Sequence, residues 1–387
     1  MFKLITFFLL NPIFWLALLT SFFISYQRIF SERKQFSIAI DNHYSEILVF
    51  LKRGLFMGLI CSVATLLLGV TVNLTWLSWY VLLTIVGLAL SFWFWDSGLL
   101  LVLVSLCALL WPRFMWHWGP FSGLSAKIGQ QTLASSLVIL SLALLSIGLL
   151  LARPSQTIIS PKIRVSKRGI RTASYHIRRL YLLPLVLLIP GDNLPTLFGL
   201  WPFFNIGAHR FTILVLPLIL GLNIHLKKRL PTELKQLRYS YFVAGGLIFI
   251  LAVLAKFLHS TLVLALVAVI IILGLKLYRL HFLHSGQAYL VEPSKGIQVL
   301  AVQKDTPAQK AGLVPGDVVL SVNDQPISSQ IQFYEMTQVS STFVKFRVQT
   351  LHKDIKLAET AIYKDSPHEL GLVTFPDRNN QETRRGF

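Results

Sequence analysis

Long apolar runs separated by short basic segments dominate the first three quarters of the chain. A helix of about 20 apolar residues crosses the ~30 Å hydrocarbon core of a membrane. Runs of roughly that length occupy residues 4–26, 55–73, 74–94, 97–111, 132–151, 180–201, 211–226, 239–258 and 261–278. The pattern predicts a polytopic all-α transmembrane bundle of about nine spans over residues 1–279, followed by an α+β domain over 286–376 and a polar tail over 377–387.

Two of these nine runs have weaker span character. Residues 97–111 are short for a span, and residues 180–201 are interrupted by Pro184, Pro190 and Gly191. Broken segments at membrane depth occur where neighbouring protein satisfies their backbone groups. If these two runs are re-entrant, the number of spans falls to seven or eight.

The composition agrees with a membrane protein. Of the 387 residues, 54% are hydrophobic and only 14% are charged, whereas about a quarter are charged in an average soluble domain. The two cysteines, Cys61 and Cys107, both lie inside apolar runs. A disulfide framework is therefore not expected.

The charge of the chain is strongly positive and unevenly placed. Lysine and arginine number 36 against 17 acidic residues, a net charge of +19. The basic residues gather in segments 28–53, 153–179 and 227–238, which all lie on one side of a nine-span arrangement. The positive-inside rule places that side in the cytoplasm, together with the C-terminal domain, and leaves the N-terminus outside. No nucleic-acid-binding motif surrounds these segments, so nucleic acid is not an expected partner.

The middle basic segment contains no acidic residue. Topology alone accounts for it; a second interpretation is a docking surface for anionic membrane lipid or for an acidic partner helix. The residues predicted to form this basic cytoplasmic loop are Lys162, Arg164, Lys167, Arg168 and Arg171.

The C-terminal domain carries a series of local backbone signals. Thr306-Pro307 suits a helix N-cap and first turn, Gly312 closes that short helix, and Pro315-Gly316 forms a turn into the next strand. Strands are expected at 297–301 and 318–322, a helix after Ser328 or Ser329, and a hairpin over 343–348 and 355–359. This order resembles that of bacterial PDZ domains, which bind peptides by strand addition.

The PDZ resemblance implies a groove between the strand that begins at Gly296 and the following longer helix. The loop that captures a free carboxylate in such domains contains a glycine, which segment 288–291 lacks. Capture of a C-terminus and binding of an internal segment therefore both remain open. The residues predicted to line the groove are Tyr289, Leu290, Gly296, Ile297, Val299, Ile331 and Tyr334.

Three further features resemble the MinJ family of bacterial division-site proteins. They are the N-terminal pattern from Asn11-Pro12 through the basic motif at 28–34, the order of many spans before one PDZ domain, and the ending at 368–372, His-Glu-Leu-Gly-Leu. The resemblance implies a scaffold that links DivIVA-like and MinD-like proteins and other divisome components. It also implies enrichment at the septum and poles.

Enzyme signatures are absent from the sequence. A membrane metalloprotease needs His-Glu-x-x-His, but His368-Glu369 is followed by Leu370-Gly371-Leu372. A rhomboid-type serine protease needs glycine where Pro120 stands. The histidines are dispersed, so no metal site and no cofactor are expected. The sequence favours a non-enzymatic scaffold; the alternatives are a regulator or accessory subunit of a membrane protease and a transporter with a regulatory PDZ domain.

Overall fold

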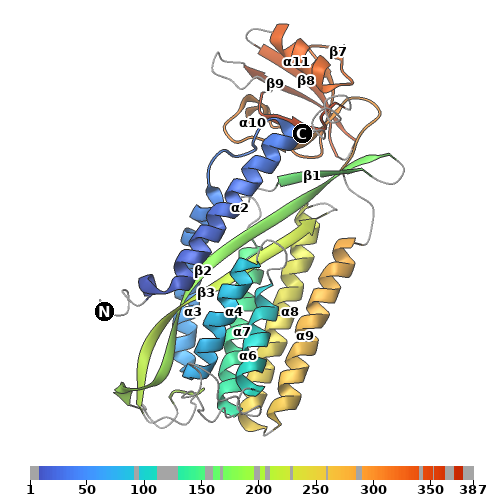
Figure 1. The fold of residues 1–387 in the computed structure, drawn as a ribbon. Helices are drawn as coiled ribbons and strands as arrows, with labels where there is room; N and C mark the ends of the chain where they lie inside the picture. Colours follow the sequence, from blue (N-terminus) through green and yellow to red (C-terminus); the bar gives the residue numbers. More distant parts are fainter. Residues whose placement is uncertain are drawn as a thin grey trace.

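The structure is a computed structural model that describes residues 8–90, 96–110, 130–152, 160–165, 169–195, 201–204, 210–226, 230–258, 260–284, 290–339, 343–351, 353–361 and 370–377. It contains a tall body of helices around a long β-hairpin, with a smaller domain at one end (Figure 1). The elements of the body are α2 (Pro12–Phe36), α3 (Ser45–Leu68), α4 (Leu74–Ala89), α6 (Ser97–Leu110), α7 (Gln130–Leu150), β1 (Ser160–Val165), β2 (Arg171–Pro195), β3 (Arg210–Leu226), α8 (Leu230–Phe257) and α9 (Thr261–His284).

Seven of the nine predicted spans correspond to helices of the described body. The segments long and apolar enough to cross a membrane are Pro12–Phe36, Ser45–Leu68, Thr132–Leu150, Leu234–Phe257 and Val263–His281. The apolar helices α4 and α6 are shorter. Local sequence sets some of the boundaries: the Asn11 side chain accepts a hydrogen bond from the Ile13 amide at 3.0 Å, and Pro12 occupies the first turn of α2.

The other two predicted spans are strands, so the all-α prediction is wrong. Residues 180–195 belong to β2, and the run at 211–226 belongs to β3. The two strands pair antiparallel from Tyr175 opposite Leu226 to Pro195 opposite Arg210. Both faces of this hairpin are largely buried, so its strands are continuously apolar and do not show the alternation of a half-exposed strand.

The backbone edge of β2 that faces α3 is satisfied by side chains. Ser62 donates to the Pro184 carbonyl at 2.7 Å and accepts from the Val186 amide at 3.2 Å. Thr65 donates to the Val186 carbonyl at 2.7 Å. The segment after α3 continues this edge, because the Val72 amide donates to the Leu188 carbonyl at 2.8 Å. A strand edge inside an apolar layer requires such partners, because water does not supply them there.

Close approach of α3 and β2 depends on two glycines. A Cβ added to Gly54 would lie 2.5 Å from the Leu182 amide nitrogen, and one added to Gly58 would lie 2.7 Å from the Pro184 nitrogen. Glycine therefore permits the helix to lie directly on the strand backbone. On the other strand, the buried Tyr80 hydroxyl donates to the Pro217 carbonyl at 2.9 Å.

The C-terminal domain has the predicted order of strands and helices. Its elements are β4 (Leu290–Val291), β5 (Ile297–Val302), α10 (Pro307–Lys310), β6 (Val318–Val322), β7 (Gln325–Pro326), α11 (Gln330–Val339), β8 (Phe343–Gln349), β9 (Ile355–Ala361) and β10 (Leu372–Thr374). The expected cap of the longer helix is present, since the Gln332 amide donates to Ser329 at 3.1 Å. The strand order is β10-β5-β6-β8-β9, with β7 paired to β6.

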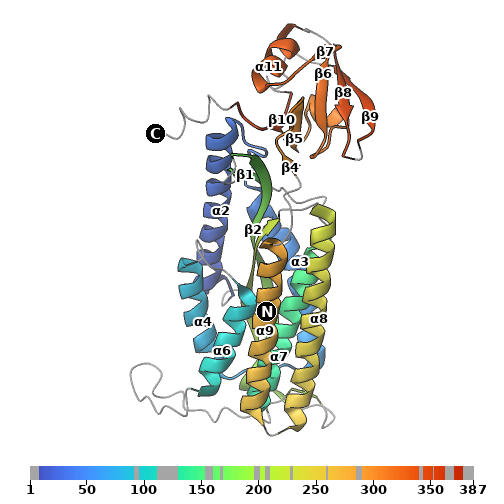
Figure 2. The same cartoon turned by 90° about the vertical axis from the view of Figure 1, so that its right-hand side faces the viewer.

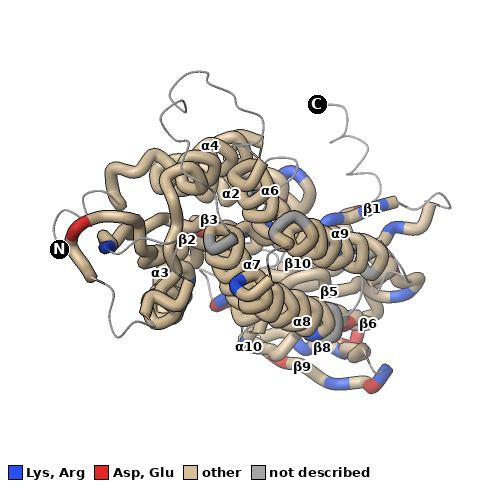
Figure 3. Tube along the Cα trace, turned by 90° about the horizontal axis from the view of Figure 1, so that it is seen from below, with Lys and Arg blue, Asp and Glu red and all other residues tan. Residues whose placement is uncertain are grey.

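The described ends of the three basic segments lie at the end of the body that carries the C-terminal domain. The end of α2, the start of β2 and the start of α8 all lie there (Figures 1 and 2). In the view from below, most of the tube is tan and the charged positions are few (Figure 3). The hairpin crosses the body twice, as the two predicted spans would have done. Replacing two helices with two strands therefore leaves the basic segments at the same end of the body.

We predict that Gly54→Ala or Gly58→Ala destabilises the full chain by about 1–3 kcal/mol, the usual cost of overpacking. The measurement is thermal unfolding of the protein in detergent. Gly274→Ala is the matched control, because an added Cβ at this helical glycine of α9 meets nothing within 4 Å. Equal melting of all three variants would contradict the proposed contact of α3 with β2.

Candidate functional site

The edge strand of the C-terminal sheet is β10, not β5. β5 pairs with β6 through Ile297 and Gln298 and with β10 through Val299, Ala301 and Val302. Ile297 and Val299 are buried in the domain core, and Gly296 forms the turn into β5 with φ +77°. The prediction that the strand beginning at Gly296 offers an open edge is therefore wrong, because β10 already occupies it.

The predicted groove residues are not brought together in one place. Leu290 is buried and pairs with Ala173 of β2, so it belongs to the junction with the body. Tyr289 lies outside the described residues. Ile331 and Tyr334 are on α11, where their side chains are 52% and 41% exposed. Of the predicted set, these two are therefore accessible to a ligand.

A tight loop precedes β10. Leu370 and Gly371 both have positive φ, 53° and 82°. Their carbonyls accept hydrogen bonds from the Ala308 amide at 3.1 Å and the Gln303 amide at 2.8 Å. A Cβ at Gly371 would lie 2.5 Å from the Cβ of Thr306. The loop therefore combines an apolar residue with a glycine directly ahead of an edge strand, the combination that was sought without success at 288–291.

The end of this strand segment reaches α11. The carboxylate of Asp377 accepts from the Gln330 amide at 3.3 Å and from the Ile331 amide at 3.2 Å. It thus satisfies backbone donors at the N-terminus of the helix, which favour a negative charge. Because the far end of the segment is fixed to α11, the edge of β10 and the exposed residues of α11 are candidates for the two sides of a peptide groove.

The domain is joined to the body through Arg171 and β2. Arg171 is buried; it forms a salt bridge with Glu292 and donates to the Pro376 carbonyl. Its guanidinium also lies over the Phe375 ring, 5.8 Å from the centroid. The Tyr175 hydroxyl donates to the Leu300 carbonyl at 2.8 Å. Arg171 is therefore a junction residue on β2, and the prediction that it belongs to a basic loop is wrong.

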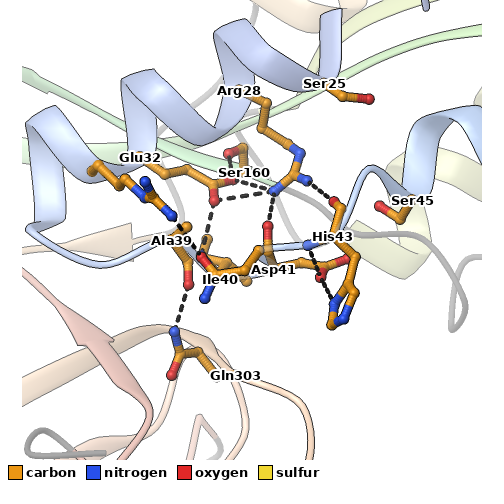
Figure 4. A network of polar contacts seen from close by, with 12 residues as sticks. Ser25, Arg28, Glu32, Ala39, Ile40, Asp41, His43, Ser45, Ser160 and Gln303 are labelled. Atoms are coloured by element: carbon orange, nitrogen blue, oxygen red, sulfur yellow. Dashed lines mark hydrogen bonds and ion pairs between the residues drawn. The ribbon is translucent and has the colours of Figure 1, made fainter. Parts of the chain in front are cut away.

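The other predicted basic residues have mixed positions. Lys162 and Arg164 lie on β1, which pairs with β2, so this part of the segment is strand and not loop. Lys167 and Arg168 lie outside the described residues. A second junction contact joins the α2–α3 connection to the domain, where the side-chain amide of Gln303 donates to the Ala39 carbonyl (Figure 4).

The searched part of the chain contains no group of three or more His, Cys, Asp or Glu side chains arranged to hold a metal. β10 is the outermost strand on its side of the sheet, although Leu372 to Thr374 are buried, and α11 exposes the apolar side chains of Ile331 and Tyr334. A sheet edge next to apolar side chains is chemistry for recognition of an extended peptide.

We predict that Gly371→Ala lowers the stability of the domain and weakens capture of a peptide partner. The substitution imposes the left-handed backbone on a residue with a Cβ, a cost of roughly 1–2 kcal/mol, and it adds the contact with Thr306. Gly312→Ala is the control, since Gly312 has φ +72° in the same domain and meets nothing within 4 Å. Thermal melts and partner pull-down with the full chain measure both effects; equal losses in the two variants would contradict a special role for the β10 loop.

Comparison with known proteins identifies the type of C-terminal domain and the relatives of the whole chain. Residues 298–347 match the PDZ domain family. The probable cell division topological determinant MinJ of Lacticaseibacillus paracasei is 28% identical over 376 residues, 95% of this chain and 97% of that protein. The cell division topological determinant MinJ of Bacillus subtilis (strain 168) is 26% identical over 380 residues, 97% of this chain and 95% of that protein. The chain carries a PDZ domain and resembles the MinJ cell division topological determinants along nearly its whole length.

Proposed function

We propose that the chain is a non-enzymatic membrane scaffold that recruits cell-division proteins through its PDZ domain. The observation that carries this proposal is the edge strand β10 beside the exposed face of α11, in a domain held at one end of an apolar helical body. A partner segment would pair with β10, whose residues are 1–4% exposed and must be uncovered first, and would place apolar side chains against Ile331 and Tyr334. The body supplies attachment to the membrane.

The partners that we propose are Min-system and divisome proteins, with DivIVA-like and MinD-like proteins first among them. The similarity to cell division determinants over nearly the whole chain supports this choice. The protein is expected to concentrate at the septum and the cell poles. Membrane lipid is the surrounding partner of the body, and no cofactor is part of the proposal.

The cytoplasmic orientation of the PDZ domain rests on charge. The described ends of the basic segments and the domain occupy the same end of the body, and positively charged segments remain on the cytoplasmic side of membranes. A partner in the cytoplasm therefore meets the groove directly.

A second candidate function is that of a regulator or accessory subunit of a membrane protease, since PDZ domains also deliver substrates to such enzymes. The same groove would serve it, but the partner would then be a protease or its substrate. Localisation through the cell cycle separates the two functions, because a division scaffold concentrates at the septum.

We predict that Tyr334→Lys weakens partner capture and disperses a fluorescent fusion from the septum, while the melting temperature stays unchanged. Tyr334 is 41% exposed, so a lysine there retains access to water and does not bury a charge, yet it removes an apolar contact of the groove. Ile331→Lys is expected to act in the same direction.

Ile355→Lys is the matched control for these variants. Ile355 is 55% exposed on β9, at the opposite edge of the same sheet from β10. Loss of capture by Ile355→Lys to the same degree, or normal capture by Tyr334→Lys, would rule out the groove. A uniform membrane distribution of the unmodified protein would contradict the division function.

We predict that a cysteine at Ser294, on an exposed turn of the domain, is not labelled by an impermeant thiol reagent in intact cells and is labelled after lysis. The background is a chain with Cys61 and Cys107 replaced by serine. Labelling before lysis would place the domain outside and would contradict the proposed orientation.

A further inference from the structure

A polar cavity lies between α2, the start of α3 and strands β1 and β2, apart from the peptide groove. Its volume is about 80 Å³. A water molecule takes up about 30 Å³ of liquid, so the cavity has room for roughly two or three waters or for one small oxyanion. The charged side chains on its walls are Arg28, Glu32, Glu46, Lys162, Arg178 and Arg179.

The two carboxylates of the cavity are held by groups around Arg28. Glu46 accepts from Arg28 Nε at 2.5 Å and from Ser25 at 2.9 Å. Glu32 accepts from Arg28 Nη1 at 3.1 Å and from the Ile40 amide at 2.8 Å, as Figure 4 shows. Both acids are buried. Arg28 and the surrounding donors therefore compensate the negative charge of the two carboxylates.

The strand side of the cavity carries additional positive charge. Lys162 on β1 and Arg178 and Arg179 on β2 contribute to its walls, so four cationic side chains share the cavity with two carboxylates. The pKa of Lys162 lies below its usual value, first because burial disfavours the ammonium and then because of the charges of Arg178 and Arg164. Arg178 donates to the neutral side chain of Gln27 at 3.2 Å. Cations gathered in a partly buried space favour entry of an anion.

The cavity lies at a level marked by exposed aromatic side chains. On α2, Tyr26 and Phe30 are exposed and stack with ring centroids 6.3 Å apart. Phe22 stacks on Tyr44 at 5.0 Å, and both rings are exposed. Tyrosine and tryptophan rings of membrane proteins collect at the depth of the lipid headgroups, and Tyr26 and Tyr44 are two such rings. Gln27 and Arg28, adjacent to Tyr26 in sequence, therefore face the cavity at headgroup depth.

We propose that this cavity binds a phosphate group, with the phosphate of an anionic membrane lipid as its source. Arginine presents paired N–H donors that match phosphate oxygens, and lysine adds a compact charge. Binding there contacts α2, β1 and β2, which also carry the junction with the PDZ domain. The lipid would thus be recognised at one specific site and not merely attracted by the overall charge of the protein.

The test uses the full chain in an uncharged detergent, titrated with a short-chain phosphatidylglycerol while thermal stability is recorded. The double variant Lys162→Gln/Arg178→Gln should bind more weakly by about fivefold for each charge removed. Arg164→Gln is the matched control, because Arg164 lies two residues from Lys162 on β1 but does not line the cavity. Lys162→Arg keeps the charge and should retain binding. If the double variant does not fold, loss of binding in Lys162→Arg would still count against the proposal.

A parallel titration with inorganic phosphate distinguishes the sources. Stabilisation by phosphatidylglycerol alone supports a lipid site, and stabilisation by both probes supports a phosphate site open to soluble ligands as well. Stabilisation by neither probe would overturn the proposal. So would a loss of binding in Arg164→Gln as large as in the double variant, since the effect would then follow total charge and not the cavity.

Discussion

Every backbone amide and carbonyl of the hairpin needs a partner, because the hairpin lies within the apolar body, and this requirement organises the surrounding helices. The two strands satisfy their shared edge by pairing with each other. Part of the outer edge of β2 is satisfied by Ser62 and Thr65 of α3, and part of the outer edge of β3 by Tyr80 of α4. An unmade hydrogen bond in such surroundings costs several kcal/mol. The small residues of α3 and the hydroxyl groups at the contacts therefore serve one purpose, the hydrogen bonding of the hairpin backbone. The apolar exteriors of the helices remain free to face lipid.

The strand that organises the body also holds the PDZ domain. β3 ends opposite Tyr175, and β4 continues along the same strand at Ala173 and Thr172. Arg171 at its first position is buried against Glu292 and the Pro376 carbonyl. A domain joined by β-pairing and a buried ion pair is held in a defined orientation, unlike one attached through a flexible linker. The proposed groove beside β10 therefore has a fixed orientation relative to the helical body.

The sequence predicts seven helices of the body and the interior of the PDZ domain well, because both follow from local rules. Thr306-Pro307, Ser329 and Gly312 occupy their predicted places. The sequence does not reveal the hairpin, since a strand buried on both faces is as continuously apolar as a membrane helix. Pro184 and Pro190 were the local signals against a helix in this segment. The open strand edge was wrongly assigned to β5 for a different reason. Strand β10 is the last of the described strands along the chain but lies beside β5 in the sheet. The order of segments along the sequence does not reveal this pairing. The Leu370-Gly371 loop carried the signal that was sought at 288–291.

The length of β2 has a mechanical consequence. Its 25 residues at about 3.3 Å each extend for roughly 80 Å, well beyond the thickness of a bilayer core, and Figure 1 shows the strand running obliquely from the PDZ junction to the far end of the body. A strand that is already extended and paired along its length can lengthen very little. The first residues of β2 at the PDZ junction and its last residues at the far end of the body are therefore held at a fixed separation.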